Sequence, residues 1–246
     1  MDAMLRDSGV VTAEEARSIH ERPTTTATPN RWATRVSALA GLVFFALMLV
    51  HGTLRSGAPS AGDPGQKIYD YLVDNAGRYQ LGAVALGLAM AAALVWLPAL
   101  YRVLRRAEGG STAAGMVAIA GGVLAAASAL VVALIEGTLA TRIEDIGPAA
   151  ARTWWTLFLM GVGPMLVGLL VLIAAVAAVS LRTHLFGRWF TTASVVLALA
   201  SLVGAFTIGY ATVGIQVVAG IALVLDGVWI LIISLMLWRH PAMADE

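Results

Sequence analysis

The chain contains no cysteine and few charged residues. The absence of cysteine from its 246 residues excludes disulfides, thiolate metal sites and cysteine nucleophiles. Charged residues make up 13% of the chain and hydrophobic residues 59%, whereas a soluble domain carries about 25% charge. Low charge combined with repeated long apolar runs is typical of polytopic membrane proteins.

Familiar motifs of catalysis and cofactor binding are also missing. The chain has no Gly-Lys-Ser/Thr phosphate loop, no G-x-S-x-G elbow and no H-E-x-x-H pair. Its four histidines fall on both sides of the predicted membrane, so neither a zinc nor a haem site is expected: His20, His51, His184 and His240. The net charge of +1 gives no electrostatic attraction to nucleic acid. We therefore expect no cofactor, no metal, no nucleic-acid partner and no catalytic residues.

Six apolar runs are long enough to cross a bilayer, which requires about 20 residues. They predict an all-α transmembrane bundle with these spans: Ala33–Leu54, Leu81–Leu104, Ala114–Leu139, Thr156–Leu181, Phe190–Ala211 and Gly214–Trp238. The predicted bundle covers 33–239, between a tail at 1–32 and a short tail at 240–246. Separation of the last two spans depends on a tight turn at 210–214. Without that turn, one longer helix would place the termini on opposite sides.

The basic residues, of which all but Lys67 are arginine, are distributed unequally between the two sides of this topology. Eleven lie on one side: Arg6, Arg17, Arg22, Arg31, Arg35, Arg102, Arg105, Arg106, Arg182, Arg188 and Arg239. Five lie on the other: Arg55, Lys67, Arg78, Arg142 and Arg152. The positive-inside rule predicts that both termini are cytoplasmic, in a cytoplasmic (inner) membrane.

The N-terminal segment, Met1–Asn30, is polar and does not resemble a secretory signal. The first apolar run is therefore interpreted as an uncleaved anchor. Thr12-Ala-Glu-Glu15 fits a capping box that begins a short helix, and a proline- and threonine-rich linker follows. This tail either docks a partner or is simply solvated.

Asp226 is the only charged residue predicted deep in the membrane. It lies about 18 Å along its helix from Gly214, where a carboxylate costs on the order of 3 kcal/mol. No arginine or lysine is predicted at a matching depth, so the expected partners are hydroxyls: Ser128, Ser201 and Thr207. Asp226 is interpreted either as a proton-relay or cation site, or as a neutral acid that holds helices together.

His51 and Glu136 lie toward the outer ends of the first and third spans. If they converge, they form a His–carboxylate pair that can titrate near physiological pH. The alternative is that each has an ordinary interfacial location. The loop at 55–80 that follows His51 is the longest, and within it Ile68–Ala76 predicts a short amphipathic helix on the membrane surface.

Small residues and prolines predict how the spans pack. Spacings such as Gly121-xxx-Ala125 and Ala200-xxx-Gly204 favour close helix contacts, either within one chain or across a homodimer, which has no other support. Prolines and glycines predict kinks in the second and fourth spans, which are interpreted as tolerated or as a hinge or binding notch: Pro98, Gly161, Gly163 and Pro164. Tryptophans near the span ends predict an aromatic belt.

Three segments carry a resemblance to a known class of proteins: Tyr69–Asp74, Tyr101–Glu108 and Leu225–Ile230. In these segments the chain resembles the small, uncharacterised multi-pass membrane proteins of high-GC bacteria, which form domains of unknown function. The resemblance implies a membrane fold and supplies no catalytic residues.

The expected function follows from this architecture and the scarcity of chemistry. The sequence predicts an integral membrane protein that acts as an accessory or scaffold subunit with a membrane-protein partner, or that binds a hydrophobic ligand or lipid. The alternative is a small proton-coupled transporter or channel-like protein that uses Asp226. A weaker alternative is an intramembrane enzyme that modifies lipid.

Overall fold

The computed structural model describes residues 31–207 and 213–239, with side chains described for 32–206 and 220–239. Regular structure in these ranges is helical throughout. The helices are α2 (Arg31–Leu54), α3 (Gly65–Ala107), α4 (Ala113–Arg142), the 3-10 turn η1 (Ile143–Asp145), α5 (Pro148–Met160), α6 (Val162–Thr183), α7 (Arg188–Thr207) and α8 (Val213–Arg239).

Six helical segments are long and apolar enough to cross a membrane, which confirms the predicted all-helical, six-span architecture at the level of length and composition. The segments are Trp32–Leu54, Gly65–Ala107, Ala113–Asp145, Pro148–Thr183, Arg188–Phe206 and Gly220–Arg239. Large apolar side chains cover their outward faces, among them Leu134, which is 70% exposed. Apolar surface on this scale is suited to lipid and not to water.

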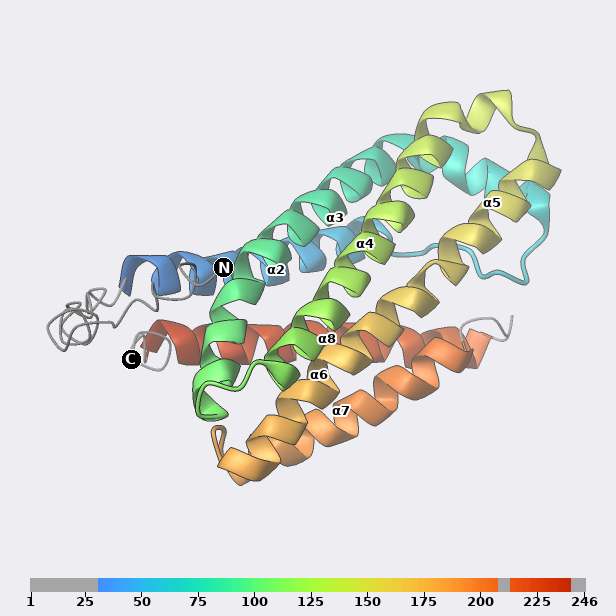
Figure 1. The fold of residues 1–246 in the computed structure, drawn as a ribbon. Helices are drawn as coiled ribbons and strands as arrows, with labels where there is room; N and C mark the ends of the chain where they lie inside the picture. The colour runs from blue at the N-terminus through green and yellow to red at the C-terminus, as the bar shows by residue number, and fades with distance from the viewer. Residues whose placement is uncertain (1–30, 208–212, 240–246) are drawn as a thin grey trace, which may run out of the picture. The chain divides into compact units, whose positions relative to one another are not determined.

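The spanning helices follow one another around the bundle (Figure 1). α3 packs between α2 and α4, α6 packs between α4 and α7, and α8 contacts both α7 and α2. Short connections make consecutive spans antiparallel. α7 and α8 are therefore two separate helices that pack side by side, which resolves the division that the sequence left open.

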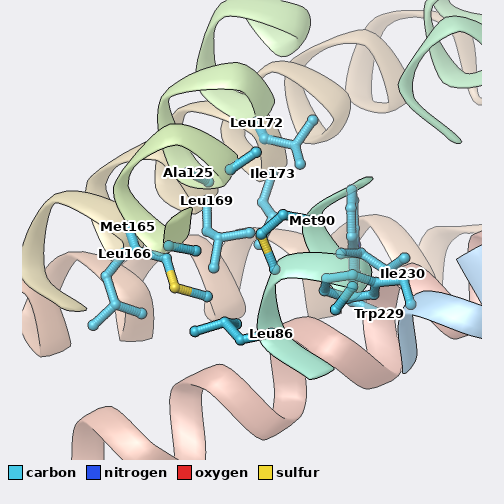
Figure 2. Packing of buried hydrophobic residues seen from close by; sticks show 14 of the residues in the cluster. Leu86, Met90, Ala125, Met165, Leu166, Leu169, Leu172, Ile173, Trp229 and Ile230 are labelled. Atoms are coloured by element: carbon cyan, nitrogen blue, oxygen red, sulfur yellow. The ribbon is translucent and has the colours of Figure 1, made fainter. Parts of the chain in front are cut away.

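Buried aliphatic side chains from α3, α4, α6 and α8 meet in the middle of the bundle (Figure 2). Met90 of α3, Leu169 and Ile173 of α6, and Ile230 of α8 are each at most 6% exposed. Because lipid is as apolar as these side chains, packing contacts rather than burial from water hold the helices together.

Glycines allow α4 and α6 to approach each other closely. A Cβ atom added to Gly121 would lie 2.6 Å from the backbone nitrogen of Leu172 and 2.7 Å from the carbonyl oxygen of Gly168. A Cβ atom on Gly168 would overlap the backbone of Ala125. The predicted Gly121-xxx-Ala125 spacing therefore packs within the chain, and its partner on α6 is Gly168.

Helix α3 is much longer than a span and corrects the predicted loop at 55–80. Its 43 residues extend about 65 Å, about twice the hydrocarbon thickness. The segment Ile68–Ala76, predicted as a separate surface helix, is the first part of α3. Ile68 and Leu72 are fully buried, because this part of α3 packs against α5. Pro98 lies within α3 and does not end it.

The fourth predicted span consists of two helices, α5 and α6, that are divided at Gly161. This glycine has φ −61° and ψ −19°, close to helical values, so the chain continues in nearly the same direction. Pro164 is the third residue of α6 and Gly163 the second. The division follows Met160, four residues before Pro164, and proline cannot donate a helical hydrogen bond to the residue four positions before it. A hinge or notch here stays a prediction.

Several predictions fall outside the described residues. These include the capping box and linker of the N-terminal tail, the turn around Tyr210 and the C-terminal tail at 240–246.

Asp63 stabilises the start of α3, and this effect is expected to depend on pH. Its carboxylate accepts hydrogen bonds from Lys67 Nζ (2.9 Å) and the Ser60 backbone N–H (2.7 Å), and the Lys67 bond in particular lowers the pKa of Asp63. A lowered pKa in the folded state gives stability that is present above pH 4 and lost as the pH falls through the lowered value. Asp63→Asn should therefore lower the unfolding temperature slightly at pH 7. Thermal unfolding at about pH 2 should show no difference, and an equal difference at both pH values would contradict this role.

Candidate functional site

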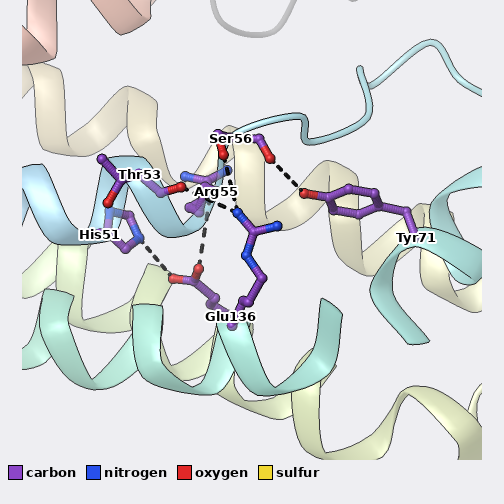
Figure 3. Close-up of polar contacts among 7 residues, drawn as sticks. His51, Thr53, Arg55, Ser56, Tyr71 and Glu136 are labelled. Carbon is purple, nitrogen blue, oxygen red and sulfur yellow. Dashed lines mark hydrogen bonds and ion pairs between the residues drawn. The ribbon is translucent and has the colours of Figure 1, made fainter. Parts of the chain in front are cut away.

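Glu136 is a fully buried carboxylate near the C-terminal end of α4. Two basic side chains reach it: His51 from the last turn of α2 and Arg55 from the residue that follows α2. His51 Nε2 lies 3.0 Å from Glu136 Oε2, and Arg55 Nε lies 3.9 Å from Oε1. Figure 3 shows both side chains directed at the carboxylate. The structure therefore brings the predicted His51–Glu136 pair together and adds Arg55 to it.

Local sequence explains this convergence. Arg55 directly follows α2 in a turn that continues from it, since its N–H bonds Gly52 O (3.3 Å). The four-residue spacing therefore directs His51 and Arg55 to the same side. On α3, Gly82 leaves room for the acid, since a Cβ atom there would lie 3.0 Å from Glu136 Oε1. Three helices thus meet at this carboxylate.

Arg55 also rests on aromatic side chains from α5. Its guanidinium carbon lies 4.2 Å from the ring centre of Phe158 and 6.0 Å from that of Trp155, which are cation–π distances. Two of the tryptophans near predicted span ends, Trp96 and Trp155, are each 1% exposed. Both side chains are therefore packed inside the bundle, so they do not contribute an exposed ring to an aromatic belt. The four-residue spacing from His51 is the signal that could have identified Arg55.

Four buried polar atoms around this cluster have no protein hydrogen-bond partner: Arg55 Nε, Tyr79 Oη, Glu136 Oε1 and Trp155 Nε1. Three are donors and one is an acceptor. Buried polar groups normally have partners, so these atoms give the cluster unused capacity to hold a proton or a small polar molecule.

Hydrogen bonds at the rim of the cluster fasten the chain after α2 to α3 (Figure 3). Arg78 Nη2 donates to Ser56 Oγ (3.2 Å) and Thr53 O (3.4 Å), and Tyr71 Oη donates to Ser56 O (3.3 Å). Because these bonds are made at Thr53 and Ser56, on either side of Arg55 in the chain, they fix the backbone position of Arg55.

Asp226 lies between α7 and α8 and is 2% exposed. Ser201 Oγ is 3.2 Å from both of its carboxyl oxygens and 3.0 Å from the carbonyl oxygen of Leu197. Of the three predicted partners, Ser201 therefore contacts Asp226. Ser128 does not, because it lies on α4, whereas α8 packs mainly against α2 and α7; its hydroxyl bonds Leu124 of its own helix. The side chain of Thr207 lies outside the described residues.

The single hydroxyl hydrogen of Ser201 allows two arrangements around Asp226. If the hydrogen points to Leu197, the hydroxyl oxygen can accept a bond from a protonated Asp226; if it points to Asp226, it serves a carboxylate. No ion pair to Asp226 is present among the described residues. Ser201 can thus serve either protonation state.

A second polar contact joins α7 and α8 close by. Trp229 Nε1 donates to Ser194 Oγ at 2.8 Å, and the Trp229 ring stacks on Phe190 with centres 6.0 Å apart. Sequence analysis did not predict this contact. Ser194 and Ser201 are seven residues apart and share a helix face, which is the signal that could have revealed it.

The outward face of this same helix pair carries an apolar groove of about 500 Å³. The lining residues come from α7 and α8: Trp189, Phe190, Thr192, Ala193, Val196, Leu197, Ala200, Leu225, Val228, Trp229 and Ile232. Apart from Thr192, they offer ring or aliphatic surface. Sequence patterns do not reveal such a groove, because it depends on the separation of two helices.

The described part of the chain contains no group of three or more histidine or acidic side chains that could hold a metal ion. Its polar clusters instead consist of isolated carboxylates with basic or hydroxyl partners.

The helices and their exposed apolar faces define a multi-pass membrane protein. Comparison of the chain with family models, curated proteins and solved structures gives no match. The resemblance to multi-pass proteins of high-GC bacteria therefore stays a prediction, and function must be inferred from the sites themselves.

Proposed function

We propose that this protein binds a hydrophobic ligand or lipid chain in the groove between α7 and α8, and that it has no catalytic chemistry of its own. The observation that carries this proposal is the groove itself: about 500 Å³, open on the outward face and lined almost wholly by apolar side chains. Its volume is within the range of small-molecule sites, about 300–1,000 Å³.

Lipid surrounds such a groove, so burial from water gives little selectivity. Preference for one occupant must come from shape and from the few polar groups nearby. Trp229 forms part of the groove wall and is fixed by Ser194 and Phe190. A fixed wall favours a ligand of defined shape over passing lipid.

The arginine distribution supports a cytoplasmic membrane with both termini inside the cell. An accessory or scaffold role is compatible with the same groove, because an apolar helix from a membrane-protein partner could occupy it. The two roles differ in the occupant and can be separated by identifying it.

Filling the groove should remove the ligand. Ala200 lines the groove, so Ala200→Trp places a large ring where a ligand would lie. Native mass spectrometry in mild detergent should show one bound lipid or hydrophobic molecule on the natural protein and much less on this variant. The matched control is Ala91→Trp, at an exposed alanine of α3 outside the groove, which should retain the ligand. Equal occupancy in both variants would contradict the proposal, and a bound protein would support the accessory role.

Proton-coupled movement is the second candidate, because Asp226 is buried and its described polar partner, Ser201, can serve either protonation state. Asp226→Asn preserves size and can still bond Ser201, so the variant should fold. If Asp226 carries protons, the proton flux that a pH gradient drives across proteoliposome membranes should be at least tenfold lower in this variant than in the natural protein. An unchanged flux would reject that role for Asp226.

A further inference from the structure

We propose that the occupant of the α7–α8 groove is an anionic phospholipid, with its headgroup at the arginine-rich end of the groove and an acyl chain along it. This inference rests on the proposed function and names its ligand. Three observations carry it: the charge at one end of the bundle, the order of residues along the groove, and the groove's length.

One end of the bundle is strongly basic. Connections and helix ends at this side carry Arg35, Arg102, Arg105, Arg106, Arg182, Arg188 and Arg239, with Glu108 the sole acidic residue of this end within the described ranges. Within the described part of the chain, none of these arginines forms an ion pair. At the opposite end, acids and bases are mixed and partly paired, as in Lys67–Asp63 and Arg142–Asp145. Unpaired arginines at one membrane face attract anionic headgroups.

The groove begins at this basic end. Arg188 is the first residue of α7, and Trp189, which follows it and is 62% exposed, lines the groove. Since α7 and α8 are antiparallel, Arg239 at the end of α8 lies on the same side of the membrane. Tryptophan favours the level of the headgroups, so the groove runs from the interface into the apolar layer.

The length of the groove is close to the hydrocarbon thickness of one membrane leaflet. From Trp189 to Ala200, the lining of α7 covers eleven residue steps, or about 16 Å of helix. Half of the hydrocarbon thickness is about 15 Å. Beyond Ala200, the Ser201–Asp226 contact marks the inner limit. An acyl chain that starts at a headgroup beside Arg188 would thus fill the groove and end near the midplane.

The arginine-rich end favours a lipid headgroup that has a phosphate but no positively charged amine. Arginine binds phosphate oxygens through two parallel N–H donors. A zwitterionic headgroup also brings an ammonium group, for which this end offers mainly other cations. The expected preference for an anionic over a zwitterionic lipid is about fivefold for each arginine that contacts the headgroup.

Competition between two lipids with identical acyl chains tests this inference. Delipidated protein is mixed with equal amounts of phosphatidylglycerol and phosphatidylcholine, and native mass spectrometry measures the ratio bound. The natural protein should favour phosphatidylglycerol at least fivefold. Arg188→Gln, and separately Arg239→Gln, should each reduce that preference about fivefold. The matched control, Arg152→Gln at an exposed arginine of the opposite end, should keep the full preference.

The outcomes separate the two levels of the proposal. Equal binding of both lipids by the natural protein would overturn the headgroup inference and leave the groove intact as a binding site. Binding of neither lipid would defeat the proposed function as well. Ala200→Trp should abolish binding of both; if its phosphatidylglycerol preference persisted, the headgroup site would lie elsewhere and the inference would fail. Thermal unfolding of each variant checks that it is folded.

Discussion

Gly168→Val is expected to disrupt the packing of α4 against α6 and to lower the unfolding temperature by about 10 °C. Any side chain at this position begins with a Cβ atom that overlaps the backbone of Ala125. Overpacking costs about 1–3 kcal/mol where neighbours can move. Here the obstacle is helix backbone, which no rotamer change can relieve, so we expect the upper end of that range. Thermal unfolding followed by tryptophan fluorescence measures the effect.

The matched control for this prediction is Gly87→Ala in the middle of α3. A Cβ atom at Gly87 would meet nothing within 4 Å. Alanine also favours helix over glycine by about 1 kcal/mol, so this variant should be as stable as the natural protein or slightly more so. If Gly168→Val were equally stable, the close α4–α6 contact would not exist in the folded protein.

Glu136→Ala is expected to cost about 3 kcal/mol of folding free energy, because it removes the acceptor on which α2, α3 and α4 converge. His51 Nε2 would lose its bond, and Arg55 would remain against Phe158 without a facing carboxylate. Removing one partner of a buried charged pair typically costs about 3–5 kcal/mol, and the partial exposure of Arg55 argues for the lower limit. Reversible unfolding in mixed detergent micelles gives the free-energy difference.

Two variants sharpen this second prediction. Glu136→Gln keeps the volume and can still bond His51, so it should lose less than half as much stability as Glu136→Ala. Glu144→Ala removes an exposed acid of η1 at the same end of the bundle and should change the stability by no more than about 0.5 kcal/mol. A loss in Glu136→Ala no larger than in Glu144→Ala would show that the cluster contributes nothing to the fold.

Hydropathy predicted the membrane helices because length and apolar composition are properties of each segment alone. The spans at 33–54, 114–139 and 214–238 agree with α2, α4 and α8 to within a few residues. The loop at 55–80 was wrong for a different reason. The charges in Lys67–Arg78 argue against a place for that segment in a bilayer, but charges do not prevent a helix from forming, and α3 begins at Gly65.

The sequence identified the polar residues of the candidate sites, but it predicted only some of the contacts between them. A lone Asp226 in an apolar run is visible in any sequence, and so is a serine in a neighbouring span, yet periodicity cannot choose between Ser128 and Ser201. Because α8 packs between α7 and α2, Asp226 contacts Ser201 of α7 and not Ser128 of α4. Similarly, Glu136 and His51 could be named as candidates, whereas Arg55 and Tyr79 join them only through tertiary packing.

The groove and the acid beneath it belong to the same helix pair. Trp229 lines the groove and bonds Ser194, while one turn away Asp226 bonds Ser201. A ligand that separates or tightens α7 and α8 would therefore act on both contacts. This proximity connects the two candidate functions, because occupancy of the groove could alter how firmly Ser201 holds Asp226.

Binding of a lipid chain between α7 and α8 can be tested most directly by cryo-electron microscopy of the protein in nanodiscs made from its native membrane lipids. We expect elongated density along the groove, from Trp189 at the interface inward to Ala200, with a headgroup feature beside Arg188. A groove closed by contact between α7 and α8, or one no better ordered than the lipid around other helices, would contradict the proposal.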